Sequence, residues 1–304
     1  MKYRDLPILR EVEAKSLTSS DGVEIFYEVV GDGELTVMLA NGLGGRLYSW
    51  GPLMEALGDG YRFISWDYRG LFESGAPERL RNLSIPDHAD DLRAIMDAEG
   101  VEQALLAGWS MGVQVSLEFT TRHPRRVLGL VLLNGTYGQV LGTAFQPLVP
   151  LPYVDIVLHE VIDLLRARPR LCARLGALAT HPRLLEAEAR LLSLVVRRPY
   201  AGSFYKRYVR DVFGGDHFSR YLRLFQELDA HSVYHLLPNI EAPALIVYGL
   251  LDILTPAYQS RQMVRRMPNA EGFRIGRASH FIVAEHPQQL ADRVSDFVRE
   301  IGAR

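Results

Sequence analysis

Short apolar runs alternate with amphipathic stretches along most of this chain, and this alternation constrains its fold more than any other feature. A strand covered by helices on both faces is almost continuously apolar, whereas a half-exposed antiparallel strand alternates polar with apolar residues. Six such runs predict parallel strands at residues 35–40, 61–66, 103–108, 126–133, 243–249 and 271–276. The predicted fold class is therefore α/β, a mostly parallel central sheet with helices on both faces.

The segments around these runs predict a hairpin and two crossover helices. Residues 14–30 form two strand-like runs joined by an Asp-Gly pair, which is typical of a tight hairpin turn. A helical pattern follows Ser84, a suitable N-cap, and stops at Gly100. A second helix is predicted over residues 111–123, where the proline that follows ends it.

The rhythm of strand and helix breaks between the fourth and fifth parallel runs. Three segments there have apolar residues at helical spacing with no strand between them: 152–168, 184–198 and 203–213. Glycines and prolines mark the edges of this region. We therefore predict an inserted helical cap at residues 137–215, carried by an α/β core of residues 1–136 and 216–304.

Composition argues against several classes of protein. The formal net charge is -2, which gives no global attraction to nucleic acid or to an anionic membrane, so no nucleic-acid partner is expected. No run reaches about 18 apolar residues, the length needed to span a bilayer. The single cysteine, Cys172, cannot form an intramolecular disulfide, and the first residues lack a secretory apolar run, so a cytoplasmic location is expected. The composition leaves the oligomeric state open.

The segment Gly108-Trp109-Ser110-Met111-Gly112 lies directly after an apolar run and directly before a predicted helix. A serine hydroxyl is a weak nucleophile unless it is exposed beside a base. A strained strand-to-helix turn exposes it, and flanking glycines let the backbone pack closely. The segment predicts a nucleophile elbow with Ser110 as nucleophile, an incidental glycine turn being the alternative. Trp109, next to the nucleophile, is expected to contact substrate.

With this elbow, and with Asp252 and His280 following in sequence, the chain resembles the α/β-hydrolase superfamily, in its capped esterase and lipase-like branch, from about residue 20 to the end. The resemblance implies the order nucleophile, acid, histidine. Asp252 follows the strand after the cap, and His280 follows the last strand. One alternative is that Asp252 only caps a turn. The other is that the base is His286, which lies six residues after His280.

The resemblance also implies an oxyanion hole in the loop after the run 35–40. Asn41 stands there where the family usually has histidine. The hole uses backbone N–H groups, which the resemblance assigns to Leu43 and Met111, so we expect the substitution to affect loop bracing more than the donors themselves.

Residues 67–74 match a further family segment, in which Phe72 replaces the usual glycine. We expect Asp67 and Arg69 to be structural, a direct catalytic role being the alternative. The glycine-rich loop before this segment also resembles a dinucleotide-binding fingerprint, but Leu47 occupies the position of its third glycine. No cofactor is therefore expected.

Two weaker features complete the sequence. His231 and His235 are four residues apart, as metal-binding histidines are on a helix, but no glutamate lies between them and no third ligand is evident, so no metal is expected. Residues 137–240 contain 13 Lys or Arg against 9 Asp or Glu. Solvated helix faces explain this surplus, with contact to an anionic surface or substrate as the alternative.

The predicted function is hydrolysis of carboxylic esters, with small to medium apolar acyl groups, through an acyl-enzyme formed on Ser110. Lactones, thioesters, carbon-carbon bonds or perhydrolysis are alternative reactions for the same three residues. A non-catalytic receptor on the same fold is the alternative from another class.

Overall fold

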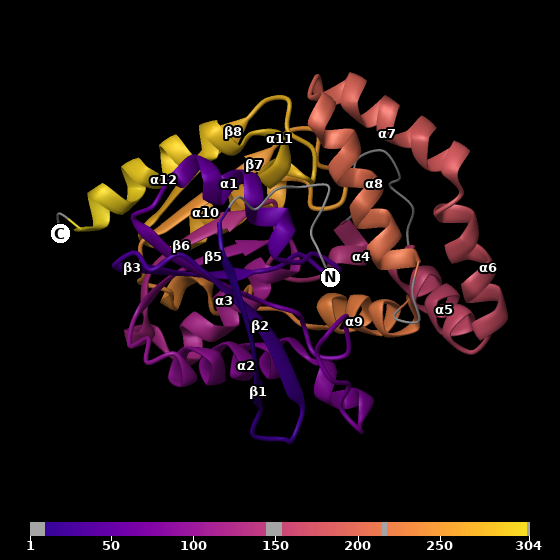
Figure 1. The fold of residues 1–304 in the computed structure, drawn as a ribbon, viewed down its shortest axis with the longest axis horizontal. Helices are drawn as coiled ribbons and strands as arrows, with labels where there is room; N and C mark the ends of the chain where they lie inside the picture. The colour runs from indigo at the N-terminus through magenta and orange to yellow at the C-terminus, as the bar shows by residue number, and fades with distance from the viewer. Residues whose placement is uncertain (1–9, 144–153, 215–217, 303–304) are drawn as a thin grey trace.

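The computed structural model describes residues 10–143, 154–214 and 218–302, which are built around one eight-stranded sheet (Figure 1). The strands are β1 (Val12–Thr18), β2 (Glu24–Val30), β3 (Leu35–Ala40), β4 (Tyr61–Trp66), β5 (Ala104–Trp109), β6 (Val127–Leu133), β7 (Ala244–Gly249) and β8 (Ala270–Ile275). Their order is β1-β2-β4-β3-β5-β6-β7-β8. The first two pairings are antiparallel and the other five are parallel. Each of the six predicted parallel strands is confirmed to within one residue.

Helices cover both faces of the sheet, which confirms the predicted fold class. Alternate residues of β3 belong to two different cores: Met38 packs toward α2 (Ile85–Ala98), α3 (Met111–Arg122) and α10 (Ala257–Arg266), and Leu39 packs toward α1 (Gly51–Leu57) and α12 (Pro287–Gly302). This alternation follows from the pleat of a strand, in which successive side chains point to opposite faces. Because both faces are covered, the strand is apolar throughout.

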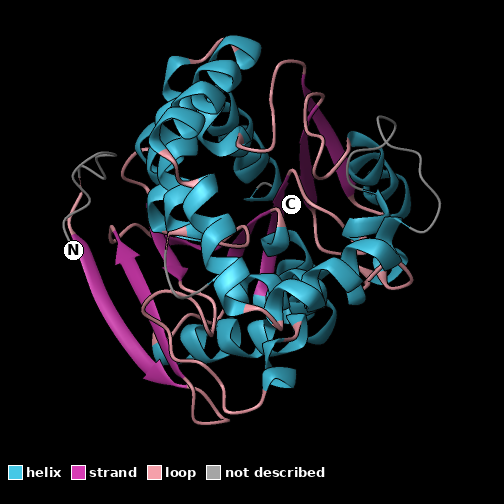
Figure 2. Cartoon of the chain, turned by 90° about the vertical axis from the view of Figure 1, so that its right-hand side faces the viewer, coloured by secondary structure: helices cyan, strands magenta, loops and turns pink. Residues whose placement is uncertain are grey.

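A layer of helices is inserted between β6 and β7 and lies beside the sheet (Figures 1 and 2). Its members are α4 (Val140–Thr143), α5 (Val154–Arg166), α6 (Pro169–Ala179), α7 (Pro182–Val196), α8 (Pro199–Phe213) and α9 (Phe218–Ala230). Helices α6, α7 and α8 each begin with proline, whose fixed φ suits the first helical position. The sequence patterns predicted α5, α7 and α8 but missed α4, α6 and α9. The predicted boundary at residue 215 lies outside the described residues.

Short elements complete the described ranges. They are α11 (Ile282–Glu285) and the 3-10 helices η1 (Leu47–Trp50), η2 (Leu80–Leu83), η3 (Pro124–Arg126) and η4 (Leu237–Asn239). Across the residues that the structure describes, no helix combines the length and the apolar character needed to cross a bilayer.

Candidate active site

Ser110 lies in the turn between β5 and α3, at the carboxyl end of the sheet. Its backbone has φ 57° and ψ -115°, a conformation that a residue with a side chain rarely adopts. The backbone N–H of Ser110 donates to the carbonyl oxygen of Leu133 at the end of β6, 3.0 Å away. The turn is therefore held by the neighbouring strand, and the hydroxyl projects beyond the sheet edge.

The glycines on either side of Ser110 are required by close backbone packing. A Cβ at Gly112 would lie 1.9 Å from the carbonyl oxygen of Ala40, and a Cβ at Gly108 would lie 2.5 Å from the carbonyl oxygen of Gly112. No side chain fits at these separations. The predicted strand-turn-helix context of the elbow is present.

The structure brings Ser110, His280 and Asp252 together. The Ser110 Oγ lies 2.9 Å from the His280 Nε2, and the His280 Nδ1 lies 2.9 Å from the Asp252 Oδ2. Asp252 is 5% exposed and His280 is 8% exposed, so the chain of hydrogen bonds is largely shielded from water. Loops after β5, β7 and β8 supply the three residues, because the carboxyl ends of these parallel strands meet at one edge.

Asp252 uses its two carboxylate oxygens for different tasks. The Oδ1 accepts the backbone N–H groups of Leu254 and Thr255, each at 2.9 Å. The Oδ2 faces His280 and lies 2.6 Å from the Thr255 hydroxyl oxygen. Asp252 is thus a turn residue, as one interpretation of the sequence held, and also the partner of the histidine ring.

His286 lies apart from the serine. Its Nε2 is 3.4 Å from the backbone carbonyl of Arg277 and its Nδ1 is 3.5 Å from the Arg198 guanidinium. Burial lowers the pKa of His286 below its ordinary value. Of the two candidate histidines, His280 is the one that contacts Ser110.

Two residues that the sequence interpretation did not single out hold the loops around the site. Asn134, with φ 42°, follows β6; its Oδ1 accepts the N–H of Gly249 at 2.8 Å and its Nδ2 donates to the carbonyl of Ser279 at 2.5 Å. Glu285 accepts the Ser279 N–H at 2.7 Å and also its hydroxyl. Burial raises the pKa of Glu285. A signal for Asn134 was present in the sequence, because asparagine at a strand end tolerates positive φ.

Asn41 braces the oxyanion loop. Its Nδ2 donates to the Ser65 hydroxyl at 3.0 Å and to the carbonyl of Trp66 at 2.7 Å, and its Oδ1 accepts the indole N–H of Trp50 at 2.8 Å. Its backbone carbonyl accepts the Tyr68 hydroxyl at 2.6 Å. The fully buried amide therefore satisfies both its donor and its acceptor, as a buried polar side chain must.

The two predicted oxyanion donors flank the serine. Met111 follows Ser110 as the first residue of α3, and Leu43 lines the same cavity as Ser110. The Leu43 carbonyl accepts the hydroxyl of Tyr208, on α8, at 2.6 Å. A Cβ at Gly44 would lie 2.5 Å from Val212, also on α8. The inserted helices therefore pack directly on the loop.

Trp109 lies beneath this loop and outside the cavity wall. Its side chain is fully buried, and a Cβ at Gly42 would lie 2.8 Å from its ring. The indole N–H donates to the backbone carbonyl of His280 at 2.8 Å. Trp109 therefore supports the loop that carries His280, and it does not make the contact with substrate that we expected from the sequence.

Asp67 and Arg69 belong to two buried ion-pair clusters away from the serine. The Arg46 guanidinium donates to both oxygens of Asp67, at 3.0 and 2.8 Å. Burial nevertheless raises the pKa of Asp67 to about 6, with Arg46 acting against that shift. Arg69 pairs with Asp91 and Asp21. These pairings tie the loop after β4 to its neighbours.

A cavity of about 340 Å³ ends on Ser110 and His280. Its wall combines core loops with the inserted helices: Leu43, Thr136, Val140, Leu141, Leu158, Ile162, Tyr208, Phe213, Phe218, Tyr221, Leu222, Phe225, Leu228, Leu254 and Thr255. No Lys, Arg, Asp or Glu is among these described lining residues, and hydroxyl groups supply the few polar positions. The cavity thus suits an uncharged, mostly apolar molecule.

His231 contacts two side chains of α3 rather than other metal-binding residues. Its Nδ1 is 2.8 Å from the Gln114 amide oxygen and its Nε2 is 3.1 Å from the Glu118 carboxylate. Within the described ranges, no three His, Cys, Asp or Glu side chains are grouped as a metal would need.

The family model described as alpha/beta hydrolase fold matches residues 36–287. The chain belongs to the α/β-hydrolase fold family. It is similar to a 2-hydroxy-6-oxononadienedioate/2-hydroxy-6-oxononatrienedioate hydrolase of Paraburkholderia phymatum, with 26% identity over 91% of each chain. It is also 35% identical to RutD of Azorhizobium caulinodans, whose name assigns it provisionally to carbamate hydrolysis, over 37% of this chain and 41% of that relative.

Solved structures agree on the fold. A hydrolase from Pseudomonas aeruginosa PA01 superposes with a TM-score of 0.75 at 20% identity, covering 94% of this chain and 98% of that one. An enol-lactonase from Burkholderia xenovorans superposes with a TM-score of 0.70 at 22% identity, covering 94% and 100%. Both structures therefore support the α/β-hydrolase fold for this chain.

Proposed function

We propose that this hydrolase cleaves uncharged carboxylic esters with small to medium apolar acyl groups, through an acyl-enzyme formed on Ser110. The observation that carries the proposal is the apolar cavity that ends on the Ser110–His280 hydrogen bond. An acyl chain loses water favourably in such a cavity, at about 0.8 kcal/mol for each buried CH₂ group. The ester carbonyl then lies next to the nucleophile.

In the proposed reaction, the His280 Nε2 takes the hydroxyl proton as the Ser110 Oγ attacks the ester carbonyl. The backbone N–H groups of Leu43 and Met111 stabilise the oxyanion, each contributing roughly 3 kcal/mol in the transition state. His280 returns the proton to the leaving alcohol, and Asp252 holds the ring in the required tautomer. Water, activated by His280, then releases the acid and regenerates Ser110.

The cavity favours an uncharged ester over the charged substrate named for the Paraburkholderia relative. That name describes a dicarboxylate, and a buried carboxylate needs a cationic or hydrogen-bonding partner. No Lys or Arg is among the described residues that line the cavity. Carbamates, lactones and thioesters share the polarity of esters and are the alternative substrates to compare. A carbon-carbon bond hydrolase, a perhydrolase and a non-catalytic receptor are the remaining alternatives.

We further propose that residues 137–215 act as the cap of a core formed by 1–136 and 216–304. Helix α9 belongs to the core by these bounds, but it contacts α5 and α6, so we propose that it helps the cap to cover the cavity. A cytoplasmic location remains part of the proposal, based on the lone Cys172.

The test is steady-state turnover of p-nitrophenyl esters from acetate to decanoate, beside γ-lactones, a thioester and a dicarboxylate monoester. We expect the largest kcat/KM at medium chain length and little turnover of the dicarboxylate. Ser110→Ala should reduce turnover about 10⁴- to 10⁶-fold. Full activity in Ser110→Ala, or a preference for the dicarboxylate, would overturn the proposal.

A further inference from the structure

The segment from the last residue of α5 to the residue before α8 has a charge opposite to that of the rest of the chain. Residues 166–198 contain eight arginines and two glutamates, a net charge of +6, although the whole chain carries -2. Seven of these arginines are exposed: Arg168, Arg170, Arg174, Arg183, Arg190, Arg197 and Arg198. The remaining 271 residues therefore carry a net charge of -8. A local surplus of this size creates a cationic surface even on an anionic protein.

The same segment exposes large apolar side chains. They are Leu175 (39%), Leu178 (59%), Leu184 (40%), Leu191 (62%), Leu194 (74%) and Val195 (46%). Single exposed apolar residues are ordinary, but a set of six on two consecutive helices, α6 and α7, marks an interaction surface.

The arrangement along α7 is regular. Arg183, Arg190 and the C-capping Arg197 recur every seven residues, so they lie in one row along the helix. Leu184 and Leu191 form the adjacent row, and the opposite face, with Leu185, Ala189 and Val196, is buried. The outer face of α7 thus combines an apolar stripe with a row of arginines, as in helices that lie in a membrane interface.

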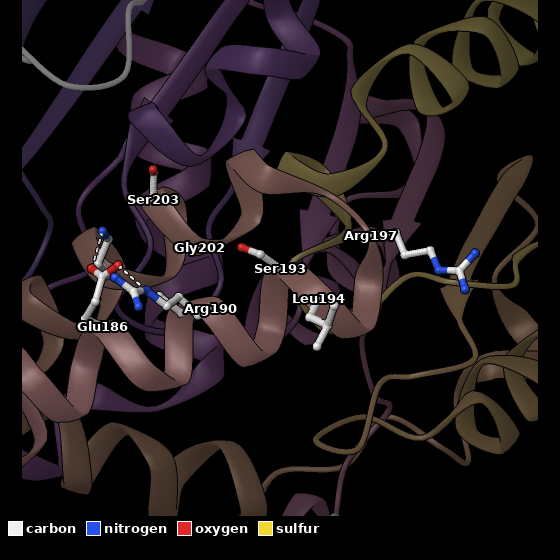
Figure 3. A pocket seen from close by; sticks show the side chains of 9 residues that line it. Glu186, Arg190, Ser193, Leu194, Arg197, Gly202 and Ser203 are labelled. Carbon is white, nitrogen blue, oxygen red and sulfur yellow. Dashed lines mark hydrogen bonds and ion pairs between the residues drawn. The ribbon is translucent and has the colours of Figure 1, made fainter.

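An open groove between α7 and α8 adjoins this row (Figure 3). Arg190, Arg197 and Lys206 lie along it together with the hydroxyls of Ser193 and Ser203. Glu186 pairs with Arg190 and Lys206 at 3.0 and 2.9 Å, which holds two cations at the groove. Figure 3 shows Leu194 and Arg197 both projecting from the last turn of α7. Cations and hydroxyls together suit a phosphate headgroup.

We propose that the outer face of α6 and α7 docks on an anionic phospholipid surface. Charge complementarity selects this partner, because leucines can enter the acyl boundary while arginines meet the headgroup phosphates. A second copy of the chain would bring the same arginines face to face, which is unfavourable. Nucleic acid would pair the arginines but leave the leucines in water.

This surface is linked to the cavity through α5. Leu158 and Ile162 line the cavity from one face of α5, and Ile156 and Val161 are exposed on another face. Helix α6, which carries part of the docking face, packs on α5. Docking would therefore bring a membrane-dissolved ester close to the helix that lines the cavity. This link to substrate rests on the proposed function, whereas the docking itself does not.

The test is flotation of the full chain with vesicles of phosphatidylcholine alone or with 40% phosphatidylglycerol, at low and at 0.5 M salt. The test variant is Arg183→Gln/Arg190→Gln/Arg197→Gln. The matched control is Arg261→Gln/Arg265→Gln/Arg299→Gln, which removes three exposed arginines from the core. A second variant, Leu191→Ser/Leu194→Ser, tests the apolar stripe.

We expect binding only to anionic vesicles, weakened by salt, and on the order of a hundredfold weaker in the α7 arginine variant but unchanged in the control. The leucine variant should also bind more weakly. Equal loss in both arginine variants, tighter binding to DNA than to vesicles, or dimerisation through the leucines would overturn the docking proposal. Turnover of p-nitrophenyl butyrate in solution should stay the same in all variants, so a failure of docking is distinguishable from a failure of the esterase proposal.

Discussion

The two walls of the cavity are built by different interactions. On the sheet side, Ser110, His280 and Asp252 are fixed by hydrogen bonds of 2.9 Å, and Asn41 and Asn134 tie their loops to neighbouring strands. On the side of the inserted helices, the wall consists mainly of Leu, Ile, Phe and Tyr side chains. Directional bonds fix the position of reacting atoms, whereas apolar packing fixes only shape and volume. We infer that the first wall sets the chemistry and the second sets the substrate.

The largest expected effect separates the two histidines on the sheet side. His280→Ala should lower kcat/KM about 10⁴- to 10⁶-fold, because Ser110 loses the base that takes its proton. His286→Ala should retain activity within roughly tenfold, since it contacts Arg198 and Arg277 instead. Steady-state kinetics on p-nitrophenyl butyrate measure both. If His286→Ala is the inactive variant, the base is assigned to the wrong residue.

Asp252→Asn should reduce kcat about 10⁴-fold with little change in KM. The amide oxygen of Asn can still accept the N–H groups of Leu254 and Thr255, so the turn is kept. The neutral amide no longer stabilises the positively charged His280 ring. The matched control is Asp21→Asn, which alters a carboxylate in the Arg69 cluster away from the serine. A kcat for Asp252→Asn close to that of the unmodified chain would contradict the role of Asp252.

The helical wall should respond differently. Ile162→Phe, which fills part of the cavity, should lower kcat/KM for octanoate esters about 30-fold while acetate changes less than about threefold. Val161→Phe on the exposed face of the same helix is the control and should change neither. If Ile162→Phe reduced acetate and octanoate turnover equally, the helical wall would be part of the chemical machinery.

Asn41→Ala should weaken both stability and turnover. It leaves the buried indole N–H of Trp50 and the carbonyl of Trp66 without a partner, so we expect the free energy of unfolding to fall by about 2–4 kcal/mol and kcat to fall about tenfold. Urea unfolding followed by fluorescence measures the first quantity. Asn269→Ala, which removes a solvent-exposed amide, should cost less than about 1 kcal/mol. Equal losses would contradict the bracing role.

The smallest effect concerns Glu285, which supports the histidine loop indirectly. Glu285→Gln should lower kcat only about threefold and change the pH dependence of stability. Because burial raises the folded-state pKa of Glu285 above its ordinary value of 4.5, its contribution to stability is complete below that value and is lost as pH rises through the folded-state pKa. We therefore expect the free energy of unfolding of the unmodified chain to fall relative to that of Glu285→Gln as pH rises. Urea titration from pH 4 to 8 measures this difference. A constant difference would contradict this assignment.

The two walls also differ in how far the sequence predicts them. Continuous apolar runs and local turn residues place β3, β5 and β7 and bring Ser110 and Asp252 to one edge, because parallel strands end together. The place of Asn134 at a strand end was visible in the sequence, but its partners Gly249 and Ser279 are more than a hundred residues away and leave no local pattern. Glu285 was missed because its burial leaves no local pattern either. The cavity wall could not be predicted, since the apolar faces of α5 and α9 look the same whether they pack on one another or line a space.

The most direct test of the central assignment is the site of covalent modification by a fluorophosphonate ester, mapped by peptide mass spectrometry. A serine activated by a hydrogen-bonded histidine reacts with such a probe, whereas an ordinary surface serine does not. We predict a single adduct on Ser110, fast in the unmodified chain and in His286→Ala, and strongly slowed in His280→Ala. No adduct would favour a non-catalytic receptor, and an adduct on another serine, or unchanged labelling in His280→Ala, would contradict the assignment.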